Sequence, residues 1–232
     1  MIQFSPDDGL ISYLYSPERN LVRQLYAFNP QTGEASFLVR PLAKSAQEED
    51  LSLEEKLRRE RLRQIELGIT QYAWAKEANQ LLIPLPDGIY VQDGVDGELR
   101  KLADGSQSPC LEARFSPDGE WVTFVQDNEI KLVSTHGGEI KQITFGAREK
   151  GVSHGLAEYI AQEEMLRAEG YWWSPDGQWL AFTEVDESHI PVYRIVHQGK
   201  DVTGEAAQED HRYPFVGQPN AHVRLGVIAR EG

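Results

Sequence analysis

The sequence is poor in several residues and patterns that would assign it to a class. Cys110 is the single cysteine, so no disulfide can form within the chain. The six histidines are scattered without H-x-x-x-H or H-E-x-x-H spacing, which argues against a zinc site. A glycine-rich loop that could cradle phosphates is also missing. We therefore expect neither a metal ion nor a cofactor.

Positive charge and long apolar runs are scarce as well. Lys and Arg total 23 against 37 Asp and Glu, which gives a net charge of −14. This charge repels nucleic acid and anionic membranes, so neither is expected as a partner. No apolar run approaches the ~20 residues of a membrane helix. The start, MIQFSPDDGL, lacks the basic and apolar regions of a signal peptide, and nothing else in the sequence assigns a compartment.

A turn motif recurs along the chain and predicts an all-β fold. Ser-Pro-Asp turns follow an aromatic residue at Phe4, Phe115 and Trp173, and an alternating strand follows each turn. Trp74 begins a degenerate copy that keeps the strand. Trp74 and Phe115 lie 41 residues apart, within the ~40–45 residues of a four-stranded propeller blade. We predict a partial β-propeller; the alternative is a β-sandwich with chance turns.

Two insertions, at about residues 43–68 and 147–170, explain the longer gaps between the copies. In the first, a capping box at Ser52 to Glu55 predicts a solvated helix of about four turns. Its basic residues are either a solvent-facing surface with salt bridges or include one arginine turned toward a binding cavity. Further on, we expect strands at 193–196 and 222–229, with a polar, acidic loop over 199–212.

The second insertion carries two adjacent acids on a predicted helix. On a helical wheel, Glu163 lies on the side that also holds Leu156 and Tyr159, and Glu164 lies at its rim. A carboxylate on an apolar side is costly unless a cation meets it. One explanation is a helical salt bridge to Arg167, four residues after Glu163. The other is that both acids bind an ammonium group, such as the free amine of a peptide, whose pKa is roughly 7.7–8.

The segment from Gly151 to Gly155 matches the G-x-S-x-G pattern of hydrolase nucleophiles. That pattern has meaning only after a buried strand, and here it follows the charged residues 148–150. We therefore expect Ser153 to cap the next helix rather than to attack a substrate. Asp186, Glu187 and His189 are expected in a solvated loop at a strand end. The sequence predicts no catalytic residue in this chain.

Longer stretches resemble a known family. GLAEYIAQEEM, GYWWSPDGQWLAFTEVDES and HRYPFVGQPNAHVRLGVI resemble the β-propeller part of dipeptidyl peptidase IV-like enzymes, serine peptidases of the prolyl oligopeptidase family. The LSLEEKLRRERLR segment resembles bacterial members, and the likeness covers nearly all of residues 3–230. It implies that the chain forms about four blades of an eight-bladed propeller. It also implies a catalytic α/β-hydrolase domain on the C-terminal side, which this chain lacks.

The resemblance assigns roles to the residues singled out above. Glu163 and Glu164 match the pair that binds the N-terminal ammonium of the peptide substrate. A supporting arginine is expected on the first inserted helix, among Arg58, Arg59, Arg61 and Arg63. Within the full enzyme this portion would recognise substrates from which N-terminal X-Pro or X-Ala dipeptides are released, whereas the chain alone would be inactive. The family also implies homodimers. The alternatives are a stand-alone propeller that acts as a binding module, and a truncated gene product.

Overall fold

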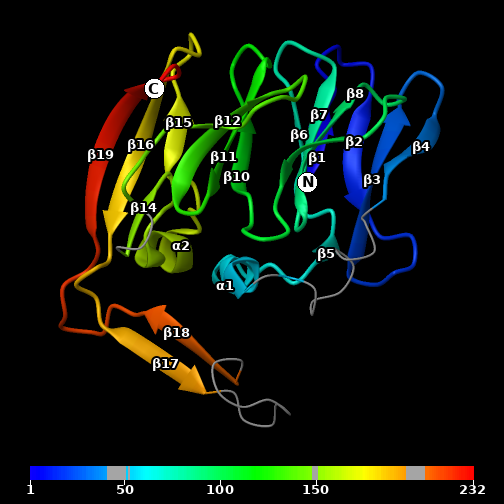
Figure 1. Ribbon diagram of the computed structural model, residues 1–232. Helices are drawn as coiled ribbons and strands as arrows, with labels where there is room; N and C mark the ends of the chain where they lie inside the picture. Colours follow the sequence, from blue (N-terminus) through cyan, green and yellow to red (C-terminus); the bar gives the residue numbers. More distant parts are fainter. Residues whose placement is uncertain (41–50, 52, 148–150, 197–206) are drawn as a thin grey trace.

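The computed structural model describes residues 1–40, 51, 53–147, 151–196 and 207–232. This part of the chain consists of β-sheets with two short helices (Figure 1). Four sheets follow one another in sequence and stand side by side as blades. The prediction of an all-β, partial β-propeller with two inserted helices is therefore confirmed.

Each blade is built mainly from antiparallel neighbours in chain order. The first contains β1 (Ile2–Phe4), β2 (Ile11–Tyr15), β3 (Val22–Asn29) and β4 (Glu34–Val39), with β5 (Leu67–Gly68) added in parallel to β3. The second contains β6 (Ala73–Trp74), β7 (Gln80–Leu85), β8 (Gly88–Asp93) and β9 (Arg100–Asp104). The third contains β10 (Leu111–Phe115), β11 (Trp121–Gln126), β12 (Glu129–Ser134) and β13 (Lys141–Gln142). The fourth contains β14 (Val152–His154), β15 (Tyr171–Trp173), β16 (Trp179–Asp186) and β19 (His222–Ala229).

The Ser-Pro-Asp turns fold through a local network of hydrogen bonds. The hydroxyl of Ser174 lies 2.5 Å from Oδ1 of Asp176 and accepts the backbone N–H of Trp179 at 2.9 Å. Ser5 and Ser116 make the same two bonds in their own turns. Because the serine joins the turn to the first residues of the next strand, the motif fixes where that strand begins.

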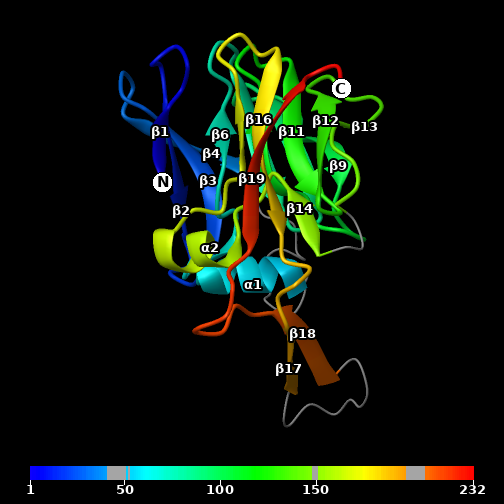
Figure 2. The ribbon, with the colours of Figure 1, turned by 90° about the vertical axis from the view of Figure 1, so that its left-hand side faces the viewer.

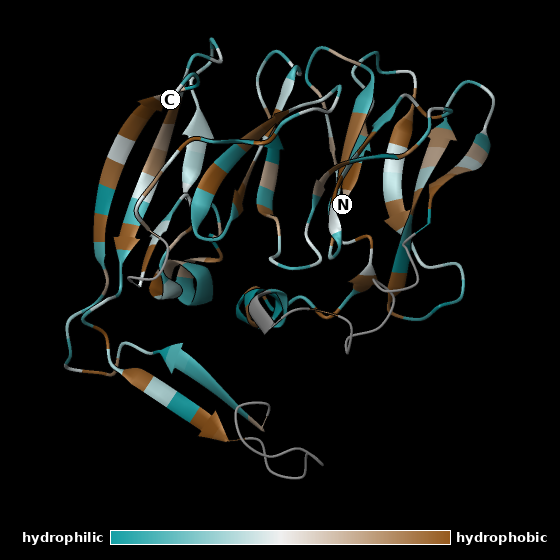
Figure 3. Ribbon diagram, viewed as in Figure 1, coloured by the Kyte–Doolittle hydropathy of each residue, from teal (hydrophilic) through white to brown (hydrophobic). Residues whose placement is uncertain are grey.

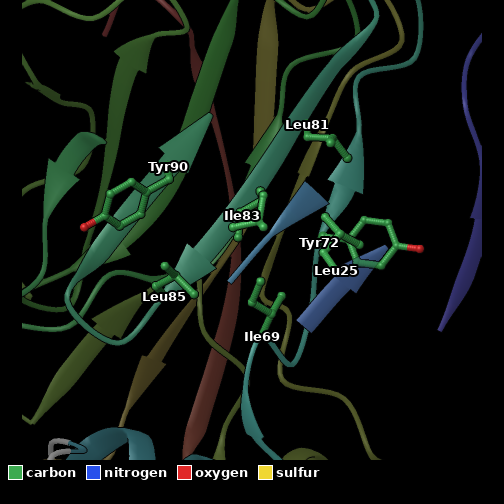
Figure 4. Close-up of a cluster of buried hydrophobic side chains, with 8 residues drawn as sticks. Leu25, Ile69, Tyr72, Leu81, Ile83, Leu85 and Tyr90 are labelled. Carbon is green, nitrogen blue, oxygen red and sulfur yellow. The ribbon is translucent and has the colours of Figure 1, made fainter. Parts of the chain in front are cut away.

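The hydrophobic core lies between the faces of neighbouring blades. Between the first and second blades, a cluster of side chains that are at most 7% exposed fills the gap (Figure 4): Leu25, Val39, Ile69, Tyr72, Leu81, Ile83, Leu85 and Tyr90. Further clusters join the second blade to the third and the third to the fourth. Removal of this apolar surface from water is what holds the blades together.

The first insertion contains helix α1 (Leu53–Arg61), which has nine residues rather than about four turns. The helix ends because Arg63 adopts a left-handed φ of 53°, with backbone bonds from Arg63 to Glu60 and from Gln64 to Arg59. Gly68 then pairs beside β3 so closely that a Cβ would overlap the carbonyl oxygen of Arg23. The helix is thereby tied to the first blade. Ser52 of the capping box lies outside the described residues.

The second insertion is a segment that leaves the fourth blade after β14 and returns to it at β15; we call residues 155–170 the α2 excursion. β14 pairs with residues 184–186 of β16, and β15 pairs with residues 180–182 of the same strand, so the chain leaves one edge and returns to it. Residues 155–170 lie between them and contain helix α2 (Tyr159–Met165). The prediction that the insertion begins at 147 was wrong, because 152–154 are paired in the sheet. The prediction that Ser153 caps a helix was also wrong: it lies in β14 opposite Val185, and the N-cap of α2 is Glu158.

A two-stranded hairpin of β17 (Val192–Val196) and β18 (Gln208–Arg212) projects away from the blades, on the side where α1 and α2 lie (Figures 1 and 2). β17 and β19 confirm the two strands predicted near the C-terminal end. The acidic loop predicted over 199–212 is wrong for residues 208–212, which pair with β17 despite their polarity. In the described part of the chain, neither helix has the length and apolar character needed to cross a bilayer.

Candidate functional site

The two inserted helices lie side by side beneath the blades, although they come from distant parts of the sequence (Figures 1 and 2). Arg61, the last residue of α1, donates from Nη1 to Oε1 of Gln162 on α2 at 3.2 Å. Its guanidinium carbon also lies 4.9 Å from the centre of the Tyr159 ring, a cation–π contact. The structure therefore brings one arginine of the first insertion to the helix that carries the acid pair.

The other predicted arginines have different surroundings. Arg58 donates from Nε and Nη2 to Oε1 of Glu112, at 3.2 and 2.8 Å. Arg59 is buried, and it donates to Oε1 of Glu55 at 3.0 Å and to the carbonyl of Glu66 at 2.8 Å. The idea that this cluster is a solvent-facing surface is wrong for Arg58 and Arg59, because both ion pairs are largely shielded from water.

Arg63 is exposed at the turn that follows α1. Among the four candidates, therefore, only Arg61 contacts α2 through its side chain in the part of the chain that the structure describes.

The helical salt bridge from Glu163 to Arg167 does not form. Helix α2 ends at Met165, and Leu166 takes a left-handed φ of 53°, so Arg167 no longer lies on the helix. Its Nη2 lies instead 3.5 Å from Oε2 of Glu158. Within the described residues, neither Glu163 nor Glu164 makes a hydrogen bond or an ion pair with a side chain.

A pocket of about 400 Å³ lies between α1, α2 and the β17–β18 hairpin, and Glu163 and Arg61 line it. Its walls are largely aromatic: the ring of Tyr213 lies 5.3 Å from that of Tyr159 and 5.0 Å from that of Phe215. Burial, together with the neighbouring Tyr213 and Glu163, raises the pKa of Tyr159. Half-buried Glu163 therefore faces the pocket, whereas Glu164 is exposed and is not among the lining residues.

Sequence reasoning missed the two aromatic residues of the pocket wall that follow the hairpin. Tyr213 and Phe215 belong to a Tyr-Pro-Phe segment whose proline suggested only a turn. The two rings pack against each other and are 40% and 43% exposed. Two aromatic residues separated by a single proline, after the polar stretch 208–212, were the signal that could have identified them.

Glu187 has a less exposed position than the solvated loop predicted for it. Burial raises the pKa of its carboxyl, and the charges of Arg61 and Arg212 together with the backbone N–H of Tyr159 partly oppose that shift. Glu187 lines a cavity together with Arg61 and Tyr159, the first residue of α2. His189 is exposed, as expected of a loop residue.

Neither Ser153 nor Cys110 has the surroundings of an activated nucleophile. His154 follows Ser153, but its Nδ1 lies 2.8 Å from Glu129 and its Nε2 lies 3.1 Å from Glu184, so carboxylates occupy both ring nitrogens. Burial raises the pKa of Cys110 to about 12, which keeps its thiol protonated. Within the same residues, no group of His, Cys, Asp and Glu side chains is arranged to hold a metal ion.

Comparisons with known proteins agree with the arrangement of the blades. The family model described as "Dipeptidyl peptidase IV (DPP IV) N-terminal region" matches residues 71–232, which is most of the chain. The chain belongs to this family. The match includes both acids of α2 and the aromatic residues of the pocket, and α1 lies before it.

Individual relatives extend the comparison. Prolyl endopeptidase FAP of Homo sapiens is 31% identical over 140 residues, which are 60% of this chain and 18% of that protein. Dipeptidyl peptidase 8 of Homo sapiens is 29% identical over 199 residues, which are 74% of this chain and 22% of that protein. The crystal structure of Porphyromonas gingivalis dipeptidyl peptidase 4 has the same fold, with a TM-score of 0.68 and 22% identity over 97% of this chain and 30% of that one. The chain thus spans about a fifth of the length of these curated relatives.

Proposed function

We propose that this chain is the substrate-recognition portion of a dipeptidyl aminopeptidase that releases N-terminal X-Pro and X-Ala dipeptides. In this proposal, Glu163 and Glu164 bind the ammonium group of the peptide. Bond cleavage belongs to an α/β-hydrolase domain C-terminal to the propeller, and the assembled enzyme is a homodimer. The names of the relatives support the peptidase class, and the family assignment supports the propeller portion.

One observation carries the assignment of the acids. Glu163 and Glu164 are adjacent and make no side-chain bond within the described residues, although Arg61 lines the same pocket as Glu163. Two neighbouring carboxylates repel each other, and an ammonium between them removes that repulsion while it gains charge-assisted hydrogen bonds. The amine of a peptide has the size and charge that this position requires.

Arg61 supports the acid pair in the proposed complex. Its guanidinium lies on the pocket wall with Glu163, so it can donate to the first carbonyl oxygen of a peptide whose amine is bound by the acids. Tyr159, Tyr213 and Phe215 offer apolar surface to the first side chain. A peptide held at its amine and first carbonyl presents its second peptide bond at a fixed distance, and this selects where the chain is cut.

The test compares two peptides that differ only at the amine. The purified chain is titrated with Ala-Pro-Ala and with N-acetyl-Ala-Pro-Ala, and binding is followed by NMR. We expect selective binding of the free amine, which weakens by roughly tenfold or more in Glu163→Gln and in Glu164→Gln, because each loses a charged partner. Binding should also weaken as the pH rises through the pKa of the peptide amine, about 8, because the amine loses its charge.

A control variant separates this effect from general electrostatics. Glu139→Gln removes one negative charge from an exposed site on the third blade and should leave the selectivity unchanged. If Glu163→Gln and Glu164→Gln retain the affinity and selectivity of the unmodified chain, the acids have no role in amine recognition.

A further inference from the structure

A series of alternating charges connects the two inserted helices through the third blade. It begins with the bond from Arg58 of α1 to Oε1 of Glu112 on β10. Oε2 of Glu112 lies 3.3 Å from Nη2 of Arg114. The same nitrogen of Arg114 lies 2.6 Å from Oε2 of Glu169. Glu169 pairs with Leu156 in an isolated antiparallel β-bridge at the base of the α2 excursion. Glu112 is therefore the acid between the two arginines.

The backbone at Glu112 has an unusual conformation. Its φ of 52° lies in the left-handed region, which favours glycine. The pairing of β10 with β11 shifts register between Leu111 and Arg114, so Glu112 lies in a β-bulge. The hydroxyl of fully buried Tyr171 bonds to the carbonyl oxygen of Glu112 and holds this bulge in place. Bulges redirect side chains, and backbone strain of this kind persists where the surroundings enforce it.

The side chains at the centre of the series are shielded from water. Glu112 is 8% exposed and Arg58 is 14% exposed. Burial alone would lower the pKa of Arg58, but the charges of Glu112 and Glu55 raise it above its ordinary value. Loss of one partner would leave a charge in a poorly hydrated site, so the arrangement resists displacement.

Arg58 and Arg61 are one helical turn apart on α1. A fixed position for Arg58 therefore fixes the turn that presents Arg61 to the pocket, while Arg114 and Glu169 fix the base of the excursion that carries the acid pair. We infer that Glu112 is a positioning residue that sets the separation of α1 and α2, so that Arg61 stands beside Glu163 when a peptide amine binds. This role rests on the proposed function, and Glu112 itself does not contact the peptide.

A double-mutant cycle tests the inference. Glu112→Gln, Arg61→Gln and the double variant are titrated with Ala-Pro-Ala and its N-acetyl form, and their thermal unfolding is measured by calorimetry. We expect Glu112→Gln to weaken binding of the free-amine peptide roughly tenfold, because it displaces Arg61. In the Arg61→Gln background the same substitution should have no further effect on binding, although it lowers the melting temperature in both backgrounds.

Two further variants define the outcomes. Glu129 is a buried acid within the blades, so Glu129→Gln should lower the melting temperature without changing the affinity for the peptide. If Glu112→Gln does not fold, Glu112→Asp, which keeps the charge, takes its place. The inference is overturned if the Glu112 variant loses stability but keeps its affinity, or loses affinity equally in both backgrounds. If Glu163→Gln and Glu164→Gln leave amine selectivity intact, the proposed function fails and the inference fails with it. If they abolish selectivity while the Glu112 variant does not, only the inference fails.

Discussion

The two inserted helices use their charges in different ways. Parts of both helices are coloured as hydrophilic in Figure 3, so charge is present on each of them. On α1, Arg58 and Arg59 are directed inward and form shielded ion pairs with acids of the chain. On α2, Glu163 and Glu164 have no such partners among the described residues. The difference separates a charged helix whose partners lie within the chain, and which serves the fold, from one whose acids are proposed to bind a ligand.

The test with the largest expected effect removes a charge from α1, whose arginines form ion pairs within the chain. Arg59→Leu should lower the free energy of unfolding by about 3–5 kcal/mol, because Glu55 loses the guanidinium that lies 3.0 Å away and the carbonyl of Glu66 loses its donor. Denaturant unfolding measures the change. Arg63→Leu, at the exposed position just beyond the helix, serves as the control and should change the stability by no more than about 0.5 kcal/mol. Equal losses in the two variants would contradict the contrast.

How much of this architecture could be predicted from the sequence depended on how far apart the interacting residues lie along the chain. The Ser-Pro-Asp turns are closed by bonds within five residues, so the blades could be predicted from Ser5, Ser116 and Ser174. The role of Arg58 could not be predicted, because its partner Glu112 is 54 residues away along the chain. The choice of Arg61 depended on Gln162, 101 residues away.

Some errors had local causes as well. The salt bridge to Arg167 failed because Leu166 ends α2 without a glycine or proline to signal it. The strand β18 was missed because its residues, Gln208 to Arg212, are all polar and are ordered by pairing with β17. In the second case, pairing with the neighbouring strand overrides the preference of a polar segment.

A second test compares Glu129, a buried acid with several hydrogen-bond partners, with Glu164, an exposed acid on α2. Burial alone would raise the pKa of Glu129, but hydrogen bonds from His154, Thr144 and the N–H of Ala147 lower it below the ordinary value of 4.5. A carboxyl with a depressed folded-state pKa stabilises the fold above its unfolded pKa, and this contribution is lost as the pH falls through the folded value.

Glu129→Gln should therefore cost about 1–3 kcal/mol at neutral pH and flatten the loss of stability below pH about 4.5. Thermal melts across a pH series measure both effects. Glu164→Gln, on the exposed side of α2, is the comparison and should leave the profile unchanged. An acid profile of Glu129→Gln identical to that of the unmodified chain would show that this network does not anchor the blades.

The smallest expected effect concerns the C-terminal end of α2. Leu166→Gly should raise the stability by about 0.5–1 kcal/mol, because glycine accepts the left-handed φ of 53° without the steric cost of a side chain. Met165→Gly, one residue earlier and within the helix, should lower it by about 1 kcal/mol. Calorimetry of both variants would reveal the difference, and a loss of stability in Leu166→Gly would mean that its side chain contributes more than the strain costs.

The way the chain enters and leaves α2 has a consequence for how such a protein can diversify. β14 and β15 take up consecutive portions of one edge of β16, and Gly155 and Gly170 bond to Thr183 between them. Only the residues between Ala157 and Ala168, which bond to each other where the segment begins and ends, could be lengthened, shortened or exchanged with no shift in the pairing of the strands. If the proposed function holds, changes in this one segment would alter ligand preference without rebuilding the blade.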